Sequence, residues 1–151
     1  MTCEWEKFRE STEEEKKKLY SKIAFQRATE PKNRGDMKDA DGYARVTGPC
    51  GDTMEIWLKV SDGIITDATF MTDGCGNSIA SCSTVTEMVK GRSTVEAQKI
   101  SQQDVLNDLG GLPSEGEHCA LLAANTLKAA VDNFLKKNSD ERAMRQHLME
   151  P

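Results

Sequence analysis

Hydrophobic residues recur with a period of two before Cys75 and at helical spacing after it. In the segment 54–60 apolar residues alternate with Glu, Trp and Lys, which predicts a strand with one buried face. Residues 61–63 read Ser-Asp-Gly, which is typical of a hairpin turn, and a second strand is predicted from 64 to 71. A weaker strand at 43–46 would complete a three-stranded antiparallel sheet.

The second half of the chain carries the signals of several helices. Apolar spacing predicts a helix over 79–89, and two short helices are predicted at 93–98 and 101–109. A long last helix is predicted to start with a capping box at 114–117. Its apolar stripe consists of Ala120, Ala123, Leu127, Ala130 and Phe134. Strands followed by helices predict an α+β fold, with the helices packed mainly on one face of the sheet.

The length of the chain fits a single domain with a modest core. All 151 residues are assigned to that domain. A further helix is predicted at 11–28, in which a run of charged residues is followed by apolar residues at helical spacing. We expect residues 1–20 to form a mobile N-terminal arm and residues 138–151 to form a polar tail.

Charge and hydropathy exclude several kinds of partner. The net charge of −5 argues against a nucleic-acid partner, because phosphate binding needs clustered Lys and Arg. No apolar run approaches the roughly 20 residues of a membrane-spanning helix, so no membrane is expected. The first residues lack a secretory pattern, which predicts a cytoplasmic protein. Five cysteines are an odd number for a disulfide framework, so metal binding or catalysis explains them better.

Three motifs each place a cysteine beside Gly, Asp or His at a predicted junction between elements. They are Gly48-Pro49-Cys50-Gly51-Asp52, Gly74-Cys75-Gly76 and Glu117-His118-Cys119. Soft thiolates with a carboxylate and an imidazole form a ligand set suited to an iron–sulfur cluster or zinc. A purely structural site would more simply use four cysteines. The mixed set therefore indicates a metal centre that is loaded and released.

The predicted helix starts give Cys75 and Cys119 a reason to be thiolates, because a helix N-terminus stabilises negative charge. Asp52 is close enough in sequence to Cys50 to reach the same metal. His118 and Cys119 are adjacent, and adjacent helical side chains point about 100° apart. We therefore expect only one of the two side chains to bind the metal at a time, unless the helix begins late. The fourth ligand stays open between Asp52 and His118.

Other thiols and imidazoles have simpler explanations. Cys82 lies on the apolar stripe of the 79–89 helix and is expected to be buried packing. Cys3 is expected to be a thiol in the N-terminal arm, and His147 a solvated residue of the tail.

Taken together, the motifs resemble the IscU/NifU-type iron–sulfur cluster assembly scaffolds. The residues that carry the resemblance are Pro31-x-Asn33-x-Gly35, Gly48 to Asp52, Gly74 to Ser81, and His118-Cys119. The resemblance runs from about Ser21 to Phe134, in the family's order and close to its spacing. It implies a scaffold without enzymatic turnover, on which iron and desulfurase-derived sulfur form a transient [2Fe-2S] cluster. The cluster would then pass to apo-proteins.

Carried over by position, the resemblance makes Cys50, Cys75 and Cys119 the cluster ligands. Asp52 or His118 would complete the coordination. Cys119 is the favoured acceptor of persulfide sulfur from a cysteine desulfurase, a role that Cys50 or Cys75 could share. Asp52 is a hard oxygen ligand in a soft site, which favours release of the cluster. Zinc could occupy the cluster-free form, and a homo-oligomer is left open.

Two differences from relatives of this family bear on the expected chaperone interaction and on the choice between cluster assembly and sulfur transfer. Scaffolds that engage a dedicated Hsp70-type chaperone carry Leu-Pro-Pro-Val-Lys before their His-Cys, whereas this chain has Leu112-Pro113-Ser114-Glu115-Gly116. The missing Lys argues against that chaperone interaction. SufU relatives, which act as zinc-dependent sulfur acceptors, carry an insertion between the second and third cysteines that this chain lacks. A zinc-dependent persulfide-transfer protein is therefore the second reading, and an adaptor with a structural metal is the third.

Overall fold

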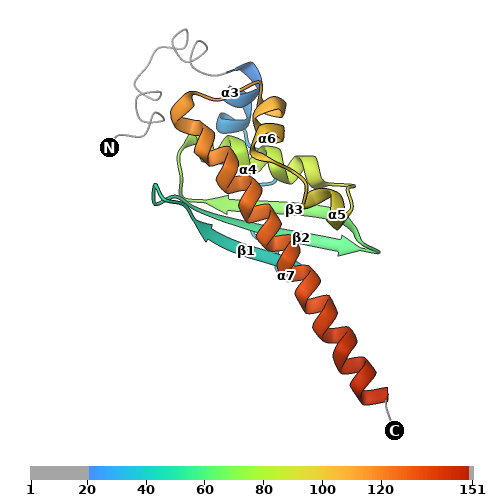
Figure 1. The fold of residues 1–151 in the computed structure, drawn as a ribbon. Helices are drawn as coiled ribbons and strands as arrows, with labels where there is room; N and C mark the ends of the chain where they lie inside the picture. The colour runs from blue at the N-terminus through green and yellow to red at the C-terminus, as the bar shows by residue number, and fades with distance from the viewer. Residues whose placement is uncertain (1–20, 150–151) are drawn as a thin grey trace.

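The computed structural model describes residues 21–149, and their side chains as far as Ser139 (Figure 1). Strands come first and most helices follow, so the α+β prediction is confirmed. In chain order the elements are α3 (Lys22–Thr29), β1 (Gly42–Thr47), β2 (Thr53–Ser61), β3 (Ile64–Thr72), α4 (Gly76–Val89), α5 (Thr94–Ala97), α6 (Gln102–Leu109), the 3-10 helix η1 (Ser114–Gly116) and α7 (Glu117–Met149). Within this described part, no helix is both long and apolar enough to span a membrane.

The three strands form one antiparallel sheet in the order β1-β2-β3, as the alternation predicts. The predicted hairpin joins β2 to β3 through Asp62 and Gly63, whose φ angles are +52° and +77°. Two successive positive φ angles are typical of the tight turns that match the twist of neighbouring strands. This turn fixes the register, in which Ile56 lies opposite Phe70. Both side chains consequently point to the same face of the sheet and are fully buried.

Helices cover that one face, with α7 lying across β1 and β2 and α4 packing on β3 (Figure 1). Helix α6 packs against both α4 and α7. Small residues allow α7 to approach β1 closely. A Cβ placed on Gly42 would lie 2.6 Å from the carbonyl oxygen of Ala130. The predicted stripe of α7 is confirmed at four of its positions, which are completely buried: Ala120, Ala123, Leu127 and Ala130.

The two short helices begin where their sequences predict. Ser93 caps α5 and Glu96 returns the hydrogen bond, so the predicted capping box is formed. Ser101 and Asp104 form a second capping box at the start of α6. Helix α6 ends at Gly110, whose φ of +74° is left-handed and suits glycine.

Three expectations about helix ends change. The described part of the first helix begins at Lys22, because Ser21 has an extended ψ of 158° and its side chain caps the helix. The rest of the 11–28 prediction, the 1–20 arm and Cys3 lie outside the described residues. The capping box at 114–117 is wrong, since Ser114 begins η1 and α7 starts at Glu117. The backbone of α7 continues as a helix through the predicted polar tail to Met149.

The packing of α7 leads to a test of stability. Leu127 is completely buried, whereas Leu121 on the same helix is 44% exposed. We expect Leu127→Ala to lower the free energy of unfolding by about 2–5 kcal/mol, because a cavity is left in the core. Leu121→Ala should cost less than about 1 kcal/mol. Urea denaturation followed by circular dichroism measures both, and equal losses would contradict this packing.

Candidate metal centre

The segment 48–52 forms a tight turn just before β2. The Gly51 N–H donates to the carbonyl of Gly48 over 3.0 Å, and the Gly48 N–H donates to the carbonyl of Asp52 over 2.8 Å. Gly51 has a φ of +90°, a conformation that favours glycine. The turn leaves Cys50 exposed and places the half-buried Asp52 at the point where β2 begins.

Cys75 lies where β3 gives way to α4. It is the N-cap residue of α4, with extended backbone angles (φ −78°, ψ −174°), and its carbonyl accepts the Ile79 N–H over 3.0 Å. Its side chain does not cap the helix. The thiol can therefore point toward the start of α7, where Cys119 is buried in the first turn.

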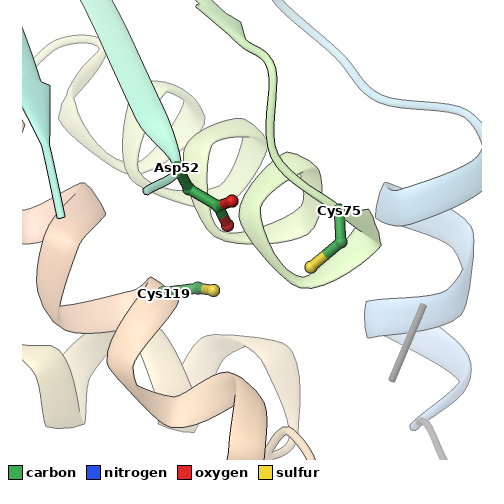
Figure 2. A group of neighbouring side chains, drawn as sticks. All are labelled: Asp52, Cys75 and Cys119. Carbon is green, nitrogen blue, oxygen red and sulfur yellow. The ribbon is translucent and has the colours of Figure 1, made fainter. Parts of the chain in front are cut away.

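Asp52, Cys75 and Cys119 form one compact group. A carboxylate oxygen of Asp52 and the two sulfur atoms all lie within 4.8 Å of one another. Figure 2 shows the three side chains pointing toward a common space from the start of β2, the start of α4 and the first turn of α7. We call this set the Asp52–Cys75–Cys119 group. Residues separated by 23 and 44 positions in the chain (from 52 to 75 and from 75 to 119) are thus brought together by the fold.

Ser78 connects two members of the group, and nothing in the sequence reading singled it out. Its hydroxyl lies 2.9 Å from Oδ2 of Asp52 and 3.4 Å from Sγ of Cys119, with geometry for donation to either. Ser78 is completely buried. A signal was present in the sequence: residues three apart share one side of a helix, so Ser78 follows Cys75 around the first turn of α4.

The prediction that the helix start makes Cys119 a thiolate is wrong for this closed arrangement. The hydrogen bond with Cys75 and the burial of the side chain raise the pKa of the Cys119 thiol well above its usual range. The Ser78 hydroxyl acts in the opposite direction, but it does not outweigh them. A helix N-terminus typically contributes only about 0.3–1 kcal/mol, less than burial costs a thiolate.

Cys82 is completely buried, as its place on the apolar stripe predicts. Burial alone raises the pKa of its thiol, which fits a packing residue, and Cys82 is not among the grouped residues.

His118 and Cys50 are not members of the Asp52–Cys75–Cys119 group. Nε2 of the exposed His118 lies 3.6 Å from Sγ of Cys119, so the imidazole reaches that sulfur despite the adjacent helical positions. Both residues lie in the first turn of α7, which starts at Glu117, so the approach does not depend on a late start of the helix. Cys50 belongs to the same turn as Asp52 but is not among the grouped residues. Cys50 would reach a shared metal only if its side chain or the turn that carries it moved closer to the group.

The donor set fits a thiophilic metal. Two sulfur atoms and one carboxylate oxygen already converge, which suits zinc or iron held by thiolates better than magnesium or calcium. Either the imidazole next to one sulfur or the cysteine on the turn before Asp52 can complete four ligands. The arrangement thus defines an α+β protein in which a group that could hold a metal lies where two helices begin.

Comparison with known proteins agrees. Residues 19–141 match the family described as NifU-like N terminal domain. The chain is 44% identical over 121 residues to the iron-sulfur cluster assembly scaffold protein IscU 1 of Archaeoglobus fulgidus, covering 80% of this chain and 79% of that protein. It is 43% identical over 123 residues to the protein of the same description, IscU, from Escherichia coli K12, covering 78% and 95%. The chain therefore belongs to the NifU-like N-terminal domain family.

Solved structures share the fold. A nitrogen-fixing NifU-like protein (N-terminal) from Brucella abortus matches with a TM-score of 0.65 at 21% identity, over 80% of this chain and 97% of that one. A putative iron-sulfur cluster assembly scaffold for the SUF system from Fervidobacterium islandicum matches with a TM-score of 0.62 at 20% identity, over 76% and 98%. At these identities the likeness shows a common fold.

Zinc binding tests whether the Asp52–Cys75–Cys119 group is the metal site. We expect Cys75→Ser to weaken Zn²⁺ binding by more than the roughly 10–100-fold that changes around a ligand typically cost, because a ligand itself is lost. Competition with a chromogenic chelator measures the affinity. Cys82→Ala on the same helix is the matched control and should bind like the wild type. Equal weakening in both variants would place the metal elsewhere.

Proposed function

We propose that this protein is an IscU-type scaffold that assembles a transient [2Fe-2S] cluster and passes it to apo-proteins. The observation that carries the proposal is the Asp52–Cys75–Cys119 group, whose ligand atoms lie within 4.8 Å of one another. The chain is also more than 40% identical to proteins described as iron-sulfur cluster assembly scaffolds. The role is that of a scaffold and sulfur acceptor, without enzymatic turnover.

The first step brings sulfur to Cys119 from a cysteine desulfurase. The Cys119 thiolate attacks the outer sulfur of the desulfurase's persulfide. A new S–S bond forms on Cys119 as the old one breaks, and the desulfurase cysteine leaves as a thiolate. His118, 3.6 Å from Sγ, is placed to accept the proton that Cys119 loses. Because Cys119 is buried, the start of α7 has to be uncovered before this attack. Cys50 is exposed and is the competing acceptor.

The second step holds iron. Cys75 lies beside Cys119, and these two cysteines would bind iron together with Cys50 once the side chain or turn of Cys50 moves closer. Two electrons from a reductant convert each sulfane sulfur to bridging sulfide and free the cysteine thiolate. His118 or Asp52 would supply the remaining ligand. Asp52 is the one oxygen ligand among sulfurs, and we propose that it keeps the cluster labile enough to leave.

The partners of the proposed role are a cysteine desulfurase and apo-protein acceptors in the cytoplasm. The chaperone-type interaction is not part of the proposal. The segment 112–116 has Gly116 in place of the Lys of the chaperone-binding stretch and adds the carboxylate of Glu115, and its last three residues form the short η1 helix.

A zinc-dependent persulfide-transfer protein is the second candidate. The same two sulfurs, carboxylate and nearby imidazole fit a tetrahedral zinc site. Under this candidate Cys119 would still receive persulfide, but no cluster would form.

One anaerobic experiment separates the two candidates. The protein is incubated with a desulfurase and cysteine, then with Fe²⁺ and a reductant, and finally with an apo-ferredoxin. We expect a visible chromophore that moves to the ferredoxin. Mass spectrometry before iron is added should find persulfide in the wild type and not in Cys119→Ser. A persulfide without a chromophore would support the zinc relay, and persulfide lost only in Cys50→Ser would move the acceptor to Cys50.

The role of Asp52 has its own test. Asp52→Cys replaces the hard oxygen with a fourth soft thiolate, so cluster transfer to apo-ferredoxin should slow by about tenfold or more. Asp73→Cys is the matched control, because Asp73 is exposed outside the Asp52–Cys75–Cys119 group. It should transfer at the rate of the wild type. Transfer that is unchanged or faster in Asp52→Cys would contradict the release role.

A further inference from the structure

Ser78 is a completely buried hydroxyl placed between two members of the metal group. Its Oγ lies 2.9 Å from Oδ2 of Asp52 and 3.4 Å from Sγ of Cys119. Most serines near the start of a helix turn their hydroxyl to the backbone as a cap. Ser78 instead contacts a carboxylate on β2 and a thiol on α7, which are the two side chains that have to stay aligned for one metal.

The hydroxyl has a single proton, so it can donate to only one of these partners at a time. The 2.9 Å contact with the Asp52 carboxylate is a normal hydrogen bond to a charged acceptor. The 3.4 Å contact is within reach of sulfur, whose radius is larger. A carboxylate whose Oδ2 is held in this way presents its other oxygen in a fixed direction.

Gly74 packs closely against both partners of the hydrogen bond between Ser78 and Asp52. A Cβ at Gly74 would lie 2.6 Å from Cβ of Ser78 and 2.8 Å from Oδ2 of Asp52, and it would also collide with the Ser78 hydroxyl. Only a residue without a side chain leaves room for the hydrogen bond. The contact between Ser78 and Asp52 therefore depends on the absence of a side chain at Gly74.

We propose that Ser78 is a positioning residue, which holds the Asp52 carboxylate in its ligand orientation beside Cys119. The inference rests on the proposed function, because it concerns the same site. Groups that orient a metal ligand typically change affinity by about 10–100-fold when they are removed. Ser78 thus acts on the metal through Asp52.

The test uses Co²⁺ and the full-length apo-protein, so that neither a desulfurase nor a cluster is needed. Bound Co²⁺ is followed through its visible and sulfur charge-transfer absorption. We expect Ser78→Ala to weaken Co²⁺ binding by about tenfold. Ser81→Ala is the matched control, because Ser81 is equally buried one turn further along α4. Its Oγ has no hydrogen-bond partner among the described residues. It should bind like the wild type.

A double-mutant cycle distinguishes positioning from a general loss of structure. If Ser78 acts through Asp52, Ser78→Ala should have no further effect on Co²⁺ affinity in an Asp52→Ala background. The same tenfold loss in both backgrounds would overturn the inference, and so would an unchanged affinity in Ser78→Ala alone. Circular dichroism and a thermal melt check folding. Should Ser78→Ala not fold, Gly74→Ala, which displaces the hydroxyl by crowding, has to give the same coupled loss.

The outcome for Ser78 is separate from the outcome for the scaffold role. A wild type that forms a transferable cluster while Ser78→Ala binds Co²⁺ normally would overturn only the positioning role. A wild type that forms no cluster, with the coupling intact, would overturn only the proposed function.

Discussion

The close packing of α4 and α7 on one face of the sheet is the constraint on which the metal group depends. Both helices begin at the same end of the sheet, so Cys75 and Cys119 meet there without a dedicated loop (Figures 1 and 2). Small residues make this approach possible, as at Gly116 directly before α7, where the side chain of Asn77 on α4 leaves no room for a Cβ. Larger residues along this interface would separate the two helix starts and, with them, the two sulfurs.

Much of the fold could be predicted because its signals are local. The alternation in β2 and the Asp62-Gly63 turn specify a hairpin, and the capping box at Ser93 marks the start of a helix. The start of α7 was placed wrongly for the same reason. A capping spacing at Ser114 is only a local signal, and the chain forms a 3-10 turn there before α7 begins.

The candidate site was less predictable than the fold. The residue types identified Asp52, Cys75 and Cys119, but not that Cys50 would stand apart from them. The protonation of Cys119 depends on burial and on the neighbouring thiol, which have no sequence signal. Ser78 was missed because a serine in a helix acquires its role only from partners that are distant in the chain.

If Cys50 is a ligand, as the proposed function has it, the exposed turn that carries it makes the number of ligands at the centre adjustable. The turn is held by two backbone hydrogen bonds, so rearranging it to bring Cys50 to the metal would have a free-energy cost that the buried members do not share. Anything that holds the turn in the rearranged form beforehand removes that cost and raises the affinity for metal without contacting the metal. The retention time of the cargo can therefore be set from the surface of the molecule, while the buried half of the site stays unchanged.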